Sequence, residues 1–392
     1  MTTRPETPAG VYVHWPFCER KCPYCDFTTF GREHPFWDRA QEYRRTLVEE
    51  IETAPARFGW AAAPRLDTVY LGGGTPSLMG AEALAEILGA LHRVFAFEPD
   101  PEITLELNPT TAEAAGIERL LALGVNRLSV GCQSFNDRVL ARLGRVHDAA
   151  TTRRAIERLR AAGVDNLSLD LIFGAPTQTL ADFRDDLCSI LEYAPEHVSA
   201  YNLTVHEGTP FARWAREGRL ELPGEEAQVA MFETLMDTLA AAGYEHYEIS
   251  NWARPGRASR HNAKYWRDAD VYGFGVAAHG VAAHGVAGAR RFANPSDLNH
   301  YLDPKRRAWA AALDAPAGER ARRGEIMMLA LRRVDGVRWA EVDAWLGDAA
   351  RRFYEAEIAR LRGDGLLESD DESFRLTRRG ILIADTVMAE FF

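Results

Sequence analysis

Short apolar runs rich in β-branched residues alternate with longer stretches of helical periodicity over the first 210 residues. The runs cover residues 11–15, 67–74, 102–109, 127–134, 166–174 and 197–205. Between them lie segments such as AEALAEILGALHRVF (81–95), in which apolar residues recur at helical spacing. Strands alternating with helices predict a parallel sheet with right-handed crossovers. Because these units are too few for a closed eight-stranded barrel, the pattern predicts an α/β fold of the open, partial (βα)6 barrel type over residues 1–210.

Polar motifs follow five of the predicted strands at the point where each strand ends. They are CERKCPYCDF (18–27), GGGTP (72–76), ELNP (106–109), QSFN (133–136) and DLIFG (170–174). In α/β barrels the chemistry lies in the loops that follow the strands. We therefore expect these motifs to meet at one rim and to share an active site.

The regular alternation stops near residue 210. Residues 211–310 begin with a helical pattern and continue into a stretch dense in aromatic residues and His, which we interpret as a substrate region that completes the core. The sequence LDAPAGERARRG (313–324) is typical of a linker. Residues 320–392 predict three helices followed by a hairpin, the order of a winged helix. No strongly basic recognition helix is present, so an accessory packing domain is the better interpretation.

Composition and charge narrow the functional classes. The 392-residue chain is 46% hydrophobic and has a formal net charge of -11, which argues against non-specific binding of nucleic acid or of anionic membranes. An odd number of cysteines, three of them clustered, indicates a reducing compartment. The polar N-terminus lacks the apolar segment of a signal peptide, and the run at 271–289 is too glycine-rich for a spanning helix. We expect a soluble, cytoplasmic protein.

The cysteine motif CxxxCxxC places Cys18, Cys22 and Cys25 in one short loop. A structural zinc site would require four ligands, and no second pair exists, because Cys132 and Cys188 stand alone. A thioredoxin-like site would need only two cysteines. A cubane iron–sulfur cluster held by three thiolates keeps one iron open, and it alone explains the missing ligand.

These motifs resemble those of the radical S-adenosylmethionine (SAM) enzymes. In that family CxxxCxxC, with an aromatic residue such as Tyr24 before the last Cys, binds a [4Fe-4S] cluster whose open iron is chelated by SAM. The GGGTP stretch resembles the family's glycine motif, which implies that Gly73, Gly74 and Thr75 contact SAM through backbone N–H donors. Without the resemblance, these glycines indicate only a tight turn.

The segment YVHWPFC (12–18) is similar to the entry motif of the oxygen-independent coproporphyrinogen III dehydrogenases (HemN) and their relatives. The resemblance implies that Tyr12 and His14 lie beside the cluster. It also implies SAM contacts from four further residues: Glu106, Gln133, Arg145 and Asp170. Considered alone, a single Glu, Gln or Asp at a strand end is more often a turn or cap residue.

Two departures separate this chain from those dehydrogenases. Phe27 occupies the position of their fourth Cys, and Tyr12 lies almost at the start of the chain, without their longer N-terminal extension. The motif HNxxYW (261–266) and the preceding YEISNWARPG (247–256) instead resemble the HemW haem chaperones of the same superfamily.

The HNxxYW resemblance implies a haem site. His261 and Tyr265 would share a helix face next to Trp266, so that an imidazole ligates iron and the aromatic rings stack on the macrocycle. His279 matches a second, weaker haem position, and His284 looks like a local duplication of it. The alternative is a packed, hydrogen-bonded histidine that contacts no ligand.

Two functions remain open. In the first, the chain would be a haem chaperone that delivers haem to acceptor proteins, membrane-bound respiratory enzymes among them. A flavodoxin- or ferredoxin-like partner would reduce its cluster. Alternatively it is an enzyme that cleaves SAM reductively and modifies a porphyrinogen, haem or, as in related methyltransferases, an aromatic metabolite. HNxxYW and Phe27 favour the first reading.

Overall fold

The computed structural model describes residues 7–112, 116–282, 291–305, 308–313, 319–346 and 350–392. Its centre is a curved sheet of six parallel strands that follow one another in chain order. These strands are β1 (Ala9–Trp15), β2 (Arg65–Gly73), β3 (Ala96–Leu107), β4 (Arg127–Gln133), β5 (Leu167–Phe173) and β6 (His197–Asn202). All six predicted strands are present, and the open, partial barrel is confirmed.

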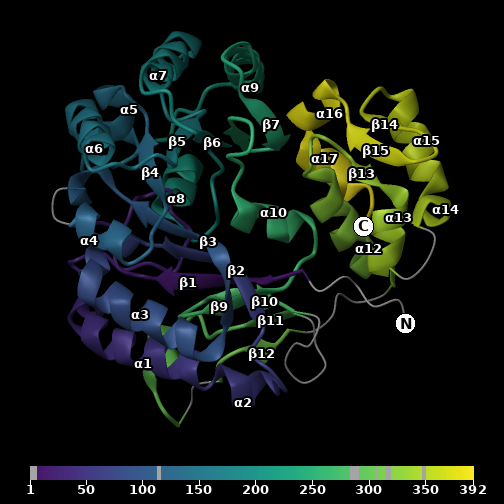
Figure 1. The fold of residues 1–392 in the computed structure, drawn as a ribbon. Helices are drawn as coiled ribbons and strands as arrows, with labels where there is room; N and C mark the ends of the chain where they lie inside the picture. The colour runs from purple at the N-terminus through teal and green to yellow at the C-terminus, as the bar shows by residue number, and fades with distance from the viewer. Residues whose placement is uncertain (1–6, 113–115, 283–290, 306–307, 314–318, 347–349) are drawn as a thin grey trace.

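Helices cover the outside of this curved sheet (Figure 1). They are α1 (Ala40–Glu52), α2 (Ala54–Phe58), α3 (Gly80–Val94), α4 (Ile117–Ala122), α5 (Asp137–Arg142), α6 (Ala149–Ala161), α7 (Leu180–Glu192) and α9 (Glu225–Ala241). The helix α8 (Pro210–Arg216) lies instead at the rim beside the cysteines, where the N–H of Phe211 donates to the carbonyl of Pro23 at 3.1 Å. Short 3-10 helices occupy Pro35–Arg39, Pro76–Met79 and Pro109–Thr111.

The strands place apolar side chains outward and polar side chains inward, the reverse of a barrel with a filled centre. Along β5, Leu167, Leu169 and Leu171 belong to the buried apolar core, whereas Ser168 and Asp170 line an internal cavity. Successive residues of a strand point to opposite faces, so this alternation makes the lumen polar. The barrel therefore encloses a space suited to a polar ligand.

The region 211–310, predicted as helical and aromatic-rich, contributes more strands than expected. The strands β7 (Glu245–Glu248) and β8 (Asn251–Ala253) extend the sheet beyond β6, and β9 (Val271–Phe274) pairs in parallel with β1. Beyond β9 lie β10 (His279–Val281), β11 (Arg291–Ala293) and β12 (Ala311–Ala312). Two helices complete the region, α10 (Arg260–Trp266) and α11 (Leu298–Leu302). These strands are only two to four residues long, too short for a periodicity signal.

The C-terminal part has its own three-stranded sheet, in the order β13-β15-β14. Its elements are α12 (Glu319–Leu331), β13 (Val337–Arg338), α13 (Trp339–Leu346), α14 (Ala350–Phe353), α15 (Glu355–Gly363), β14 (Leu367–Ser369), β15 (Ser373–Leu376), α16 (Arg378–Leu382) and α17 (Ala384–Ala389). The three helices and the hairpin of a winged helix are therefore present. The expected third helix is divided into α14 and α15, and α12 begins inside the segment interpreted as a linker.

The C-terminal domain packs beside β7 and α10 (Figure 1). Arg332 forms an ion pair with the buried Glu248 at 3.1 Å, and its guanidinium lies 4.4 Å from the ring centre of Trp266. This contact joins the domain to the helix that carries the HNxxYW motif. In the part of the chain that the structure describes, no helix is long and apolar enough to cross a membrane.

Candidate functional site

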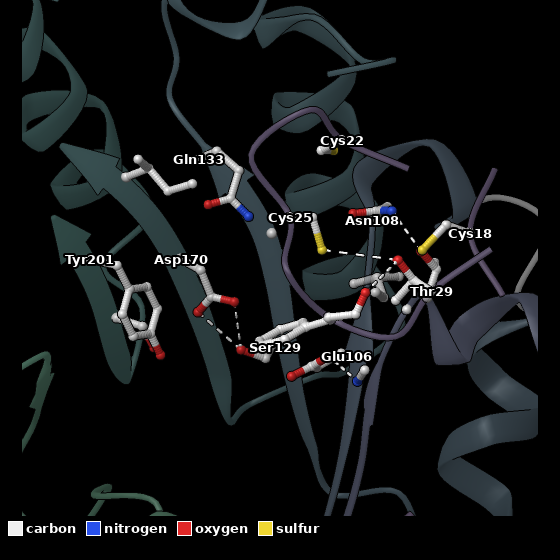
Figure 2. A pocket seen from close by; sticks show the side chains of 18 of the residues that line it. Cys18, Cys22, Cys25, Thr29, Glu106, Asn108, Ser129, Gln133, Asp170 and Tyr201 are labelled. Carbon is white, nitrogen blue, oxygen red and sulfur yellow. Dashed lines mark hydrogen bonds between the residues drawn. The ribbon is translucent and has the colours of Figure 1, made fainter. Parts of the chain in front are cut away.

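A cavity of about 490 Å3 extends from the rim of the barrel into its lumen. Its wall is formed by the cysteine loop (residues 18–30), the glycine loop (residues 72–76) and the inward side chains of β3 to β6. Figure 2 shows side chains of these strands facing the cysteines across this space. The cavity brings together most of the predicted site residues: Cys18, Cys22, Tyr24, Cys25, Gly73, Gly74, Thr75, Glu106, Gln133, Arg145 and Asp170.

The cysteine loop is closed by backbone hydrogen bonds. The N–H of Cys18 donates to the carbonyl of Phe30 at 2.9 Å, and the N–H of Phe30 donates to that of Pro16 at 2.7 Å. The three cysteines are free and partly buried, and all of them line the cavity, whereas Cys132 is buried in the core and Cys188 is exposed on α7. The loop thus presents the three predicted thiols, and only those, to one space.

The donor set fits an iron–sulfur cluster better than a single ion. Among the described residues, no three His, Cys, Asp or Glu side chains gather closely enough to hold one metal ion. A cubane spreads its thiolate ligands over separate irons. Burial raises the pKa of the Cys18 thiol to about 11 and also raises that of Cys25, so in the absence of a bound cation both are protonated. Binding of iron would therefore release protons.

Tyr12 and His14, predicted beside the cluster, lie behind the cysteine loop rather than on the cavity wall. The hydroxyl of Tyr12 is 3.0 Å from His14 Nδ1, and His14 Nε2 is 2.9 Å from the carbonyl oxygen of Thr28. Burial lowers the pKa of His14 to about 4, so the ring is neutral and donates through Nε2 to that carbonyl. His14 therefore ties β1 to the cysteine loop.

The glycine loop packs directly against the cysteine loop. Gly73 has φ 107°, and a Cβ there would lie 2.5 Å from the ring of His14. A Cβ on Gly74 would lie 2.8 Å from the carbonyl oxygens of Trp15 and Phe17. Only glycine permits this close approach of the two loops.

In this structure the N–H groups of the loop, predicted to donate to SAM, donate to acceptors within the protein. The N–H of Gly73 donates to Glu106 at 3.1 Å, that of Gly74 to Trp15 at 2.7 Å, and that of Thr75 to Phe17 at 2.9 Å. A backbone donor has one hydrogen, and each of these is engaged within the protein. The glycines contribute close packing and carbonyl groups, while the donors hold the site together.

Two carboxyl groups face the lumen from neighbouring strands. Glu106 on β3 accepts from Tyr70 at 2.8 Å, and Asp170 on β5 accepts from Ser129 at 3.0 Å with both oxygens. Burial raises the pKa of Glu106 to about 7, and the nearby Asp170 adds to the rise. Burial also raises the pKa of Asp170, against the effect of its serine donors. Such groups suit ribose hydroxyls or an ammonium group.

Gln133 and Arg145 lie at the rim. Gln133 has φ 66°, a left-handed backbone that a non-glycine residue adopts only when its surroundings hold it there. Arg145 donates to Cys22 Sγ at 3.5 Å and to Asn108 Oδ1 at 2.5 Å, and its buried Nε has no partner among the described residues. The guanidinium is thus next to the cysteine loop and retains one donor for an anionic group.

The HNxxYW helix occupies a different place from the one expected of a haem ligand. His261 is 1% exposed, its Nδ1 lies 3.0 Å from Thr68 Oγ1, and its Nε2 lies 3.2 Å from the hydroxyl of Tyr265. Burial lowers its pKa to about 3. Both nitrogens are engaged and the ring is enclosed, so the alternative of a packed, hydrogen-bonded histidine describes this conformation. Trp266 stacks under Arg332 instead of facing a ligand.

The second proposed haem residue, His279, is exposed on β10 and is absent from the cavity wall. His284 lies outside the described residues. Several cavity residues were not predicted from the sequence: Asn108, Arg127, Ser129, Ser168, His197, Ser199, Tyr201, His206 and Asn262. Most of them could have been predicted from the alternation of polar with apolar residues along the third to sixth strands, because the polar residues of that pattern face the lumen.

Comparison with known proteins agrees with the fold and the motifs. The radical SAM superfamily model matches residues 12–187, and the HemN C-terminal domain model matches 319–383. Coproporphyrinogen III oxidase (HemN) from Escherichia coli, a radical SAM enzyme, shares the fold with a TM-score of 0.80 at 23% identity, covering 100% of this chain and 91% of its own. These matches identify a radical SAM domain over residues 12–187, the kind of domain that implies a [4Fe-4S] cluster and SAM, and they show that the fold of HemN is shared.

Full-length relatives define the family more closely. The haem chaperone HemW of Bacillus subtilis is 34% identical over 97% of this chain and 98% of its own length. HemW of Mycobacterium tuberculosis is 36% identical over 99% of this chain and 96% of its own length. HemW of Escherichia coli is 37% identical over 69% of this chain and 70% of its own length. The chain is a member of the HemW family.

Proposed function

We propose that this protein is a haem chaperone that binds haem and delivers it to haem-dependent proteins, respiratory enzymes among them. The observation that carries the proposal is its full-length similarity to proteins named haem chaperones, in both the barrel and the C-terminal domain. Phe27, in place of the fourth Cys of the dehydrogenases, agrees with this and argues against porphyrinogen decarboxylation.

In this proposal Cys18, Cys22 and Cys25 hold a [4Fe-4S] cluster. SAM lies along the glycine loop and meets four residues that line the same cavity: Glu106, Gln133, Arg145 and Asp170. When bound, a reduced cluster supplies an electron that can cleave SAM. The residues of the chain do the rest: the cysteine loop holds the iron, Arg145 offsets negative charge beside Cys22, and Glu106 accepts hydrogen bonds.

For the haem itself we favour the mouth of the cavity. Phe27 is 58% exposed and Tyr201 is 45% exposed, although both are large aromatic residues and both line the cavity. Exposed apolar surface at a pocket indicates a binding site. Flat rings of this kind stack on a macrocycle, which is itself a flat aromatic system.

His206 stands at the same mouth and offers an axial ligand. It is exposed and lines the cavity, and its Nδ1 lies 3.6 Å from Asp26 Oδ2. A histidine that ligates a metal usually directs its second nitrogen to a carboxylate, which leaves Nε2 for the metal. Arg20, also at the wall, is placed to pair with a propionate.

The mouth is the better haem candidate than the HNxxYW helix. His261 would have to leave Thr68 and Tyr265 and emerge from the core before it reached iron. His279 needs no such change, because it is exposed, but it does not line the cavity. We keep His279 as the alternative ligand.

The partners follow from this assignment. Haem is the cargo, haem-binding proteins are the acceptors, and a flavodoxin- or ferredoxin-like protein supplies the electron for the cluster. The cytoplasm is the compartment in which the free cysteines stay reduced. We propose no nucleic-acid partner, in keeping with the acidic net charge.

Haem titration under anaerobic conditions tests the proposal. The reconstituted protein should show a Soret shift on adding haem and should pass the haem to a haem-free acceptor. His206→Ala should weaken binding at least about tenfold, roughly 1.4 kcal/mol, whereas His34→Ala, an exposed His absent from the cavity wall, should have no effect. Equal affinity of His206→Ala and the parent would remove the mouth as the site. Absence of haem binding by the parent would remove the function.

A second function is favoured by one observation, the polar lumen below the rim. A chaperone has no evident need for an enclosed polar space beside a SAM site, whereas a radical SAM enzyme would hold its substrate there. Incubation with SAM, a reductant and coproporphyrinogen III separates the two. Oxidative decarboxylation of that porphyrinogen would replace the chaperone proposal by the enzymatic one.

A further inference from the structure

The cavity does not end at the predicted SAM residues but continues to the opposite end of the barrel. Arg127, the first residue of β4, lines the same cavity as Gln133 at the other end of that strand. At about 3.3 Å per residue, the two lie roughly 20 Å apart along the strand. The floor of the lumen, as we call this end, is formed by Arg127, Ser168, His197, Ser199, Ser259 and Asn262.

Arg127 is a buried cation without an anionic partner. Its side chain is 2% exposed, and its Nη1 donates at 3.1 Å to two neutral oxygens, Asn166 Oδ1 and the carbonyl of Arg257. In the part of the chain that the structure describes, no carboxylate lies within 4.0 Å of its guanidinium. A guanidinium cannot lose its charge in a protein, and burying such a charge unpaired is costly.

Asp170 is the carboxyl group whose pKa the charge of Arg127 lowers, but among the described residues the two form no ion pair, so the guanidinium has no carboxylate in direct contact. His197 Nδ1 is 2.8 Å from Ser168 Oγ and its Nε2 is 2.8 Å from the Tyr247 hydroxyl, so this imidazole is occupied by two neutral partners. The Asp170 carboxylate accepts from Ser129 and from Ser168 at 3.0 and 3.1 Å. Ser168, Ser199 and Ser259 line the same cavity as Arg127, and their hydroxyls can also donate to an incoming anion.

The floor is held in place by the HNxxYW helix. Two residues at the start of α10, Ser259 and Asn262, line the cavity. The backbone N–H groups of Arg260 and His261 donate to the buried Glu102 at 3.1 and 3.0 Å, and His261 bonds Thr68 on β2. His261 is thus a positioning residue that fixes Asn262 against the lumen.

We propose that the floor of the lumen binds the carboxylate of a small polar ligand, with Arg127 as its charge partner and the floor hydroxyls and Asn262 as its hydrogen-bond partners. A carboxylate matches the planar guanidinium and restores charge balance. The polar lining of the floor suits a small polar ligand better than a flat apolar ring system. The ligand would lie below the predicted SAM residues, where a reactant would face the cofactor. The proposal does not depend on haem binding.

The test compares acids with their amides on the full-length protein carrying its cluster. Succinate and succinamide, and acetate and acetamide, differ in charge but little in shape, and sodium chloride equalises the ionic strength. Titration calorimetry should show succinate or acetate binding at least about tenfold more tightly than its amide. Arg127→Gln should abolish that preference, Arg127→Lys should keep part of it, and Arg154→Gln, an exposed arginine, should not change it.

Two outcomes would overturn the proposal. One is an equal affinity of acid and amide for the parent protein. The other is a preference that survives in Arg127→Gln, since it would then arise elsewhere. Should that variant fail to fold, crystals of the parent soaked in sodium bromide give an independent answer. An anomalous peak beside the Arg127 guanidinium is expected, and a floor that holds only water would contradict the proposal.

Discussion

Replacing His261 by alanine separates a structural histidine from a haem ligand. The change leaves the buried Thr68 hydroxyl without its partner, which costs about 1–3 kcal/mol, and removes a ring stacked on Tyr70 at 5.2 Å between centroids. Lost packing adds about 1–2 kcal/mol. We expect a total destabilisation of about 3 kcal/mol, a large share of the roughly 5–15 kcal/mol that stabilises a typical domain.

The assay pairs urea unfolding with haem titration on the same preparations. His261→Ala should lower the free energy of unfolding by the stated amount, and the folded fraction should bind haem within about twofold of the parent. His261→Gln is the matched variant, because its amide can still bond Tyr265 but is a poor iron ligand. It should regain part of the stability. His279→Ala, at an exposed site, should change stability by no more than about 0.5 kcal/mol.

The opposite pair of results, unchanged stability with lost haem affinity, would identify His261 as a haem ligand. If His261→Ala kept its stability within about 0.5 kcal/mol and lost haem affinity tenfold or more, the imidazole would be a ligand and not a packing group. If both His261→Ala and His261→Gln altered the Soret spectrum while keeping the stability of the parent, the imidazole would likewise be a ligand of the haem iron.

Three further changes follow from the site and its supports. Because burial raises the Glu106 pKa from 4.5 to about 7, the folded state keeps a proton that the unfolded chain releases, and stability falls as pH rises between these values. Glu106→Gln should abolish this fall, worth about 3 kcal/mol above pH 7, in urea titrations of cluster-free protein; identical pH profiles would contradict the pKa assignment. Gly74→Ala, whose Cβ would meet backbone at 2.8 Å, should lower the melting temperature and the iron content, whereas Gly89→Ala in α3 should do neither. Arg332→Ala should cost about 3–5 kcal/mol by stranding buried Glu248, against at most about 1 kcal/mol for the exposed Arg378→Ala; similar losses would show that the interdomain pair is not special.

The barrel was predictable because its six strands are long enough to carry a pattern and each ends in a polar motif. The edge strands were not, because β8 to β12 hold two to four residues and owe their conformation to neighbours such as β1. The C-terminal helices followed from periodicity. The break at Tyr354 did not, because that residue ends one helix and begins the next through a backbone of φ -107° and ψ 23°.

The site was predictable in its residue types and less so in their contacts. Cys18, Cys22 and Cys25 were found from spacing alone, since one loop must carry them together. The roles of His14 and His261 required the structure, because an imidazole in a motif looks the same whether it meets a ligand or a buried hydroxyl. The engaged N–H groups of the glycine loop were equally hidden: Gly73 donates to Glu106, thirty-three residues away. Arg127 was overlooked because a strand-initial Arg usually points to solvent.

The central claim is that the cysteine loop holds a [4Fe-4S] cluster with one iron open to SAM. Electron paramagnetic resonance of the reduced, reconstituted protein tests it most directly, with and without SAM. We predict the signal of one [4Fe-4S] cluster per chain, which changes when SAM is added and is absent when Cys18, Cys22 and Cys25 are all replaced by alanine. A spectrum that SAM leaves unchanged while the cluster is intact, or normal iron and sulfide in the triple variant, would contradict it.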